Sequence, residues 1–248
     1  MSTILPKTST AMSALLRSDF TTQWRNRRSV VLVLLVPVII LISWKGVANK
    51  MGAPFVLSTC ITIGLTAIGL MGYSNSLARD RDKGVFQRLR VAPIPTSLIM
   101  ISRLAVQMTM IILLTSIVFY VSYNQLHITL SPMGYILGYL TAFAGGALYL
   151  GLGQMIAGML KNAETVNSTT RLVYFVFIMV GMFGDLGVLG DELKKVIHWS
   201  PYGTVKTIIS AAMQPEVWTN DTTMALLATA GYAVLFSALG IKRFRWTV

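Results

Sequence analysis

Residues 79–95 of this 248-residue chain read RDRDKGVFQRLRVAPIP, and long apolar runs lie on both sides of them. The first twelve residues of the segment carry its charges: Arg79, Asp80, Arg81, Asp82, Lys83, Arg88 and Arg90. Each such charge costs roughly 2.5–3.5 kcal/mol at the centre of a bilayer, so the segment cannot lie in hydrocarbon. It must lie in water between two membrane spans, and this decides the fold class.

The composition indicates a membrane protein and argues against nucleic-acid binding. Hydrophobic residues make up 54% of the chain and charged residues 12%, whereas a soluble domain carries about twice that share of charge. The pI of 10.1 alone would suit a nucleic-acid-binding protein, but the basic residues lie between apolar runs rather than along one soluble face. With Cys60 as its one cysteine and with two histidines, His127 and His198, the chain is predicted to hold no disulfide and no metal.

Six apolar runs are long enough to cross a bilayer. They cover Val30–Trp44, Ala53–Leu77, Thr96–Tyr123, Pro132–Leu160, Thr169–Val188 and Met224–Ile241. The predicted fold is therefore an all-α integral membrane protein, with residues 1–248 forming a single transmembrane domain. In the fourth span, Gly138, Ala142 and Gly146 recur every four residues on one face, which predicts a helix-packing surface.

Two further segments are predicted to be helical without spanning. Residues 11–28 alternate polar and apolar side chains, and we expect an interfacial helix with Leu16, Phe20 and Trp24 on its apolar side. The alternative is a cytoplasmic extension of the first span. Residues 190–221 carry charges and short apolar patches, which predict two short helices on or dipping into the outer leaflet, separated at Pro201 and Gly203.

The distribution of basic residues sets the orientation. Sixteen of the 21 Lys and Arg residues fall at the termini and in the loops of one side, and five fall on the other. Because cytoplasmic loops are enriched in Lys and Arg, both termini and the 79–95 segment are predicted to be cytoplasmic. The 190–221 segment is then predicted to be outside.

The charged segment also contains a short helical pattern. Val85, Phe86 and Leu89 share one face, Gly84 precedes them, and Pro93 stops the helix before the next span. Such a helix could dock on a partner protein, lie on lipid, or serve only as a positively charged anchor that sets the orientation. Large apolar side chains on a segment this charged favour a protein groove as their destination.

The residues of this segment resemble a known motif. Asp82-Lys83-Gly84-Val85, followed by Leu89 and Pro93, resembles the cytoplasmic coupling helix between the second and third spans of type-two ABC exporter permeases. Asp82 stands where that family usually has Glu, and Val85 where it more often has Thr. The turn Trp199-Ser200-Pro201-Tyr202-Gly203 before the last span is also similar to the family, whose members carry outer helices there.

The resemblance implies a function and partners. It implies a permease subunit in the plasma membrane, of bacterial type, that exports a hydrophobic compound such as a drug, lipid or peptide-like molecule. It implies a second permease subunit, identical or different, and separate ABC ATPase chains that hold ATP and Mg²⁺, so this chain itself has no cofactor and no catalytic residue. The residues expected to contact the ATPase are Arg81, Asp82, Lys83, Gly84, Val85, Phe86, Arg88 and Leu89.

An ATP-independent secondary transporter is the alternative function. Such proteins usually place ionisable residues in the middle of the membrane as ion relays. In this sequence Arg103, Arg171 and Asp185 all fall toward the ends of predicted spans. The pattern therefore favours the permease.

Overall fold

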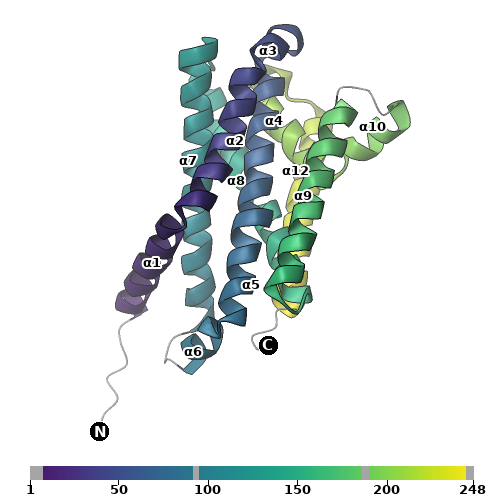
Figure 1. The fold of residues 1–248 in the computed structure, drawn as a ribbon. Helices are drawn as coiled ribbons and strands as arrows, with labels where there is room; N and C mark the ends of the chain where they lie inside the picture. The colour runs from purple at the N-terminus through teal and green to yellow at the C-terminus, as the bar shows by residue number, and fades with distance from the viewer. Residues whose placement is uncertain (1–7, 92–94, 186–189, 244–248) are drawn as a thin grey trace.

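A computed structural model describes residues 8–91, 95–185 and 190–243, and every regular element within these ranges is helical (Figure 1). Five helical segments are long and apolar enough to cross a membrane. They are α4–η1–α5 (Ala53–Thr66, Ala67–Tyr73 and Ser74–Asp82), α7 (Thr96–Leu126), α8 (Pro132–Met159), α9 (Ala163–Asp185) and α12 (Asn220–Arg243). The prediction of an all-α integral membrane protein is confirmed.

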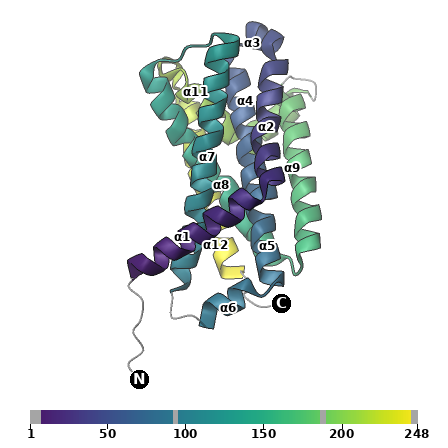
Figure 2. The same cartoon turned by 60° about the vertical axis from the view of Figure 1, so that its left-hand side comes forward.

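Two further helices pass the same test for a membrane span only when they are taken together as a bent pair. α1 (Thr8–Arg25) meets α2 (Arg27–Ser43) at an angle of 60°. α2 has 17 residues and contains Pro37; at 1.5 Å per residue it extends about 26 Å. α1 turns away from the bundle and packs across α7, as Figure 2 shows. The segment between α2 and α4 is a short helix, α3 (Lys45–Met51).

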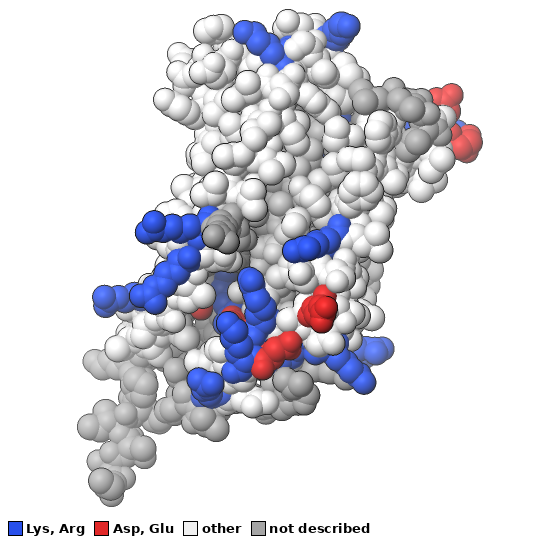
Figure 3. Space-filling model, in the orientation of Figure 1, with Lys and Arg blue, Asp and Glu red and all other residues white. Residues whose placement is uncertain are grey.

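The two ends of the bundle carry different elements. α1, α6 (Val85–Val91) and the last turn of α12 lie at one end, and α3 and α10 (Asp191–His198) lie at the other (Figure 1). Lys and Arg side chains gather over the α1 and α6 end, and a smaller basic group lies over α3 (Figure 3). This is the arrangement that the charge bias predicts for an even number of spans. That the α6 end is cytoplasmic stays a prediction.

The centre of the bundle is α8, which packs against η1, α4, α11 and α12. Glycine lets two of these helices touch through their backbones. A Cβ atom on Gly153 of α8 would lie 2.3 Å from the carbonyl oxygen of Gly69 in η1, and a Cβ on Gly69 would lie 2.5 Å from the backbone of Tyr149. No larger residue fits at this crossing without moving a backbone.

The outer helices differ from the prediction in one respect. α11 (Pro201–Ala212) does not lie on the surface but is buried over most of its length, against α4, α8 and α12. It begins where the Ser200 side chain accepts a hydrogen bond of 3.2 Å from the Gly203 backbone N–H, an N-cap. Gly203 therefore lies inside the first turn of α11 and does not separate the helices. Its role is close packing, because a Cβ there would meet the Ile197 carbonyl oxygen.

Two span boundaries also move. α9 begins at Ala163, six residues before the predicted start at Thr169, so Arg171 lies at its ninth residue rather than at its end. The predicted end of that span, Val188, lies outside the described residues. The second span continues through α5 to Asp82, which carries Arg79, Asp80 and Arg81 on a continuous helix instead of a loop.

Candidate functional site

The predicted coupling segment forms a tight turn followed by a short helix. Gly84 has a φ of +67°, in the left-handed region that glycine adopts without steric cost. The turn reverses the chain after α5, and α6 (Val85–Val91) runs beneath the ends of the spans (Figure 2). Pro93, predicted to stop this helix, lies outside the described residues.

Phe86 is not available to a partner, contrary to the sequence expectation. Its side chain is completely buried within the chain. The guanidinium of Arg103 in α7 lies 4.8 Å from the centre of its ring, and Arg103 Nη1 also donates to Asp80 Oδ2 at 2.5 Å. Leu89 is half-buried against the same core. The apolar face of α6 therefore packs onto its own subunit. There the Phe86 ring lies against the guanidinium of the Asp80–Arg103 ion pair.

Arg81 is likewise internal rather than beside a partner contact. Its side chain is 1% exposed. Arg81 Nη1 donates to the Ala157 carbonyl oxygen at 2.6 Å and Nη2 donates to the Lys161 carbonyl oxygen at 2.9 Å. The last carbonyl groups of a helix lack partners within that helix. Here the Arg81 guanidinium donates to the Ala157 carbonyl in the last turn of α8 and to the Lys161 carbonyl just beyond it.

Asp82 caps the start of the next helix, α9. Its Oδ2 accepts a hydrogen bond of 2.7 Å from the backbone N–H of Ala163, the first residue of α9. A carboxylate is favoured at this position by the exposed N–H groups and by the helix dipole. Arg81 and Asp82 therefore bind the end of α5 to the end of α8 and the start of α9. We call these two residues and their three backbone partners the span-end clamp.

The surface of the segment that remains exposed is polar. Lys83, Gln87 and Arg88 are exposed, and Arg88 Nη2 donates to the Lys83 carbonyl oxygen at 3.5 Å. Gly84 and Val85 are half-buried between this surface and the bundle. A contact between the segment and an ATPase stays a prediction, and these three are among the exposed side chains open to such a contact, whereas Phe86 is not.

The predicted interfacial helix is anchored at one polar point. Asp19 Oδ2 accepts a hydrogen bond of 2.6 Å from the Ser102 hydroxyl of α7. Burial raises the pKa of the Asp19 carboxyl, and the Ser102 hydrogen bond and the nearby Arg103 oppose that change. Phe20 and Trp24 are 39% and 61% exposed, and Leu16 is half-buried. The location of this helix at a membrane surface stays a prediction.

The small-residue stripe of α8 faces α7 of the same subunit. A Cβ on Gly138 would lie 2.8 Å from Phe119 Cζ, and one on Gly146 would lie 2.3 Å from Ile111 Cδ1. Ala142 between them is fully buried. The stripe is therefore occupied inside the subunit.

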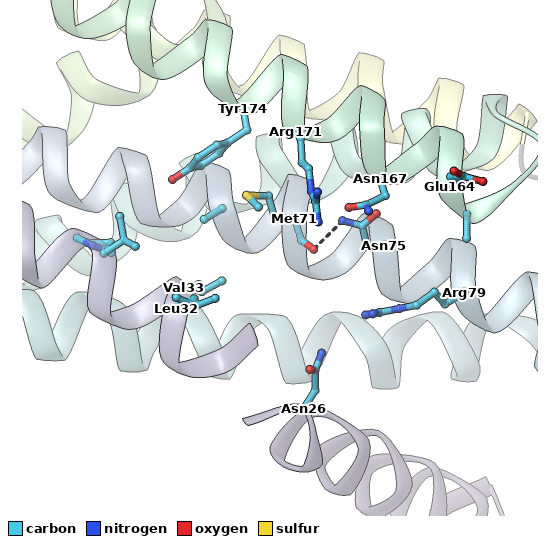
Figure 4. Close-up of a pocket in the computed structure, with 14 residues that line it drawn as sticks. Asn26, Leu32, Val33, Met71, Asn75, Arg79, Glu164, Asn167, Arg171 and Tyr174 are labelled. Carbon is cyan, nitrogen blue, oxygen red and sulfur yellow. Dashed lines mark hydrogen bonds between the residues drawn. The ribbon is translucent and has the colours of Figure 1, made fainter. Parts of the chain in front are cut away.

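A groove of about 780 Å³ lies between α2, η1–α5 and α9 (Figure 4). Its outer part is apolar and is lined by Leu32, Val33, Val36, Pro37, Ala67 and Met71, with Tyr174 beside them. Its part nearer the α6 end is polar and is lined by Asn26, Asn75, Arg79, Ala163, Glu164, Asn167 and Arg171. The groove thus changes from apolar to cationic along its length.

The π-helical segment η1 creates the floor of the groove. Ala67, Met71, Asn75 and Arg79 all line it at intervals of four residues. In an α-helix every fourth residue advances by about 40° around the axis, so four such positions would spread over a third of the circumference. The wider turn of a π-helix winds less per residue and offsets that drift. Met71 and Asn75 are further tied by the Asn75 Nδ2 hydrogen bond of 2.9 Å to the Met71 carbonyl oxygen.

Arg79 and Arg171 face this groove from different helices (Figure 4). Within the described part of the chain, neither side chain makes an ion pair or a hydrogen bond. The Oδ1 atom of Asn75, also in the groove lining, is buried without a partner. Sequence reasoning missed this group because Arg171 was expected at the end of a span. The four-residue spacing from Ala67 to Arg79 was visible, but over four positions of a regular α-helix it would spread across about a third of the circumference.

Comparison with known protein families gives a match. A family model described as ABC-2 type transporter matches residues 10–214, which extend from α1 to the end of α11 and include both the span-end clamp and the groove. Among curated proteins no match is found.

Proposed function

Because the chain belongs to the ABC-2 type transporter family, we propose that it is the transmembrane permease subunit of an ATP-driven exporter. The family match covers more than half of the chain and makes it a multi-pass permease component of an ABC transporter. The family implies association with an ABC ATPase in a membrane. Export as the direction, a separate ATPase chain and a second permease subunit are parts of the proposal.

The span-end clamp is the observation that carries this proposal. A permease driven by a partner must convert movement of a cytoplasmic element into movement of its spans. α6 follows α5 after one tight turn, and α5 is bound by Arg81 and Asp82 to the ends of α8 and α9. A force applied to α6 therefore acts on three span ends together. A charged loop that served only to set orientation would not need these bonds between helix ends.

We assign the ATPase contact to the exposed face of the segment, with Lys83, Gln87 and Arg88 as its polar side chains. The partner would hydrolyse ATP with Mg²⁺, and this chain would supply no catalytic group. Phe86 and Leu89 would act from inside, because their packing against α7 and the Asp80–Arg103 ion pair keeps α6 rigid on the bundle.

We assign the transport pathway to the groove. Two permease subunits that face each other across α2 and α9 would enclose two copies of it, one from each subunit. The outer part of the groove is apolar, which supports a substrate with a hydrophobic body. Exposed apolar side chains along both helices, among them Ile39, Leu172 and Phe175, fit a face that meets a second subunit or the substrate rather than water.

The test reverses the charge of two side chains on the proposed ATPase contact. As a control, it makes the same change on α3, at the opposite end of the bundle. In the purified complex, Lys83→Glu with Arg88→Glu should weaken ATPase binding at least tenfold, because like-charge contacts replace opposite ones across the interface. Lys45→Glu with Lys50→Glu makes the same change of net charge on α3 and should leave ATPase binding unchanged. Both variants must insert and fold, as judged by their melting temperatures.

Two results would contradict the proposal. The first is unchanged ATPase binding and unchanged substrate-stimulated hydrolysis in the Lys83/Arg88 variant, which would leave α6 as an anchor only. The second is transport in vesicles that contain the permease without any ATPase, which would favour the secondary transporter.

A further inference from the structure

We propose that the groove between α2, η1–α5 and α9 binds a transported amphiphile with an anionic head group, such as a carboxylate or a phosphate monoester on an apolar body. This inference rests on the proposed function and specifies the substrate class. Hydropathy alone suggested only a hydrophobic compound. The charged residues that line the groove restrict the substrate class to compounds that also carry an anionic group.

The two groove arginines lie at different depths and on different helices. Arg79 is on α5, near the α6 end. Arg171 is the ninth residue of α9, so it lies roughly 12 Å along the helix from Ala163. Figure 4 shows Arg171 reaching from α9 toward Met71 and Asn75, with Arg79 further toward the α6 end. An anionic group in this part of the groove would lie between two guanidinium groups.

Two buried arginines at this end of the bundle, Arg81 and Arg103, contrast with the two that line the groove. Arg103 is paired with Asp80, and Arg81 is bound to two carbonyl oxygens. Arg79 and Arg171 have no such partner in the described part of the chain, although Glu164 lines the same groove. A cation inside a membrane span is costly unless it meets an anion or water, and such residues mark ligand pathways; Arg171, the ninth residue of α9, is one of them.

The geometry of the groove fits one kind of ligand. A guanidinium binds carboxylate and phosphate oxygens through two parallel hydrogen bonds, so two of them select an anionic head. The partnerless Oδ1 of Asn75 would accept a hydrogen bond from a hydroxyl on that head. Beyond it, Val33, Met71 and Tyr174 offer an apolar wall for a chain or ring system. A neutral apolar compound would leave both guanidinium groups without a partner.

The experiment compares two lipids with the same acyl chain, one with an anionic phosphate monoester head and one with a zwitterionic phosphocholine head. The complete complex, purified with its ATPase and placed in nanodiscs of phosphatidylcholine, is titrated with lysophosphatidic acid and with lysophosphatidylcholine of the same acyl chain. We expect lysophosphatidic acid to bind about tenfold more tightly or better, since ionised hydrogen-bond partners are worth roughly that much. Arg79→Gln with Arg171→Gln should abolish the difference. Arg171→Lys should retain part of it, and Lys45→Gln with Lys50→Gln should retain all of it.

Three outcomes would overturn the inference, and each is separable from failure of the proposed function. Equal affinity for the two lipids, or a preference that survives in the Arg79/Arg171 variant, would show that the arginines do not select a head group. Arginine-dependent binding without stimulation of ATP hydrolysis or transport would identify a structural lipid instead of a substrate. In all three cases ATPase co-purification and basal hydrolysis would persist, whereas their loss would contradict the permease assignment itself.

Discussion

At the scale of single residues, arginine serves two purposes at one end of this bundle. Arg81 and Arg103 are buried and hold helix ends and an adjacent carboxylate, so removing either would leave buried polar groups without partners. Arg79 and Arg171 face a groove and have no partner. An arginine side chain is therefore structural at two of these positions and available to a ligand at the other two. The difference lies in whether a carbonyl or carboxylate oxygen is within hydrogen-bonding distance.

Glycine provides the second residue-scale feature, and it yields a prediction. Gly153→Ala should destabilise the protein by about 1–3 kcal/mol, the usual cost of overpacking a core. The new methyl group would lie 2.3 Å from the Gly69 carbonyl oxygen, so α8 and η1 would have to separate. The measurement is the melting temperature of the purified protein in detergent.

Gly231→Ala is the matched control for that prediction. A Cβ at Gly231 of α12 meets nothing within 4 Å, and the change also improves helix propensity. This variant should be as stable as the native protein or slightly more stable. If Gly153→Ala and Gly231→Ala melt at the same temperature, the close approach of α8 and η1 is not part of the native structure.

At the scale of elements, α6 and η1 each derive their role from an irregularity beside or within a helix. The left-handed Gly84 reverses the chain so that α6 folds under the spans, and this buries Phe86. The π-helical turn of η1 keeps four side chains on one face, and this forms the groove floor. Neither feature changes the hydropathy of the chain, yet each decides which side chains a partner or ligand can reach.

The docking of α1 on α7 gives a prediction about pH. Burial raises the pKa of Asp19, so the folded state holds the proton more tightly than the unfolded state. The stabilisation is complete below the unfolded pKa and is lost as the pH rises through the raised pKa. We therefore expect Asp19→Asn, which still accepts a hydrogen bond from Ser102, to match or exceed the native stability at pH 7.

The check is the difference in melting temperature between Asp19→Asn and the native protein from pH 7 down to pH 4. The difference should shrink as the native carboxyl becomes protonated, because the two side chains then resemble each other. Asp191→Asn, in the exposed first turn of α10, is the control and should show no such convergence. A variant that is less stable than the native protein at pH 7 would mean that the ionised Asp19 stabilises the fold through Arg103.

At the scale of the whole molecule, the helices form one bundle with α6 at one end and α3 and α10 at the other (Figure 1). The span-end clamp, the ion pair beneath Phe86 and the polar part of the groove all lie toward the α6 end. A movement imposed there would change the contacts at the mouth of the groove first. This arrangement suits a transporter that is driven from one side.

The topology predicts which residues a membrane-impermeant thiol reagent reaches. With Cys60 replaced, a cysteine at Gln87 should be labelled only after the cells are opened, and a cysteine at Glu216 should be labelled on intact cells. Both side chains are exposed, so access depends on the side of the membrane rather than on burial. Labelling of both positions on intact cells would contradict the orientation inferred from the basic residues.

The amino-acid sequence by itself determined the helical class, the approximate spans and the position of the coupling segment between the second and third of them. These properties are sums over local stretches of chain, since the cost of placing a charge or an apolar side chain in a bilayer depends little on the neighbouring helices. The short helix after Gly84 was predictable for the same reason, because proline and glycine act on the backbone locally.

Only the tertiary structure decided which side chains are covered and which remain open. Phe86 and Arg81 belong to the most charged stretch, yet both are buried, because α7, α8 and the start of α9 close over them. α11 was expected at the surface and lies inside the bundle. Arg171 belongs to the groove because α9 starts early and η1 turns Met71 and Asn75 toward it. Each outcome depends on contacts between segments far apart in sequence. The hydrophobic periodicity of a single helix does not predict such contacts.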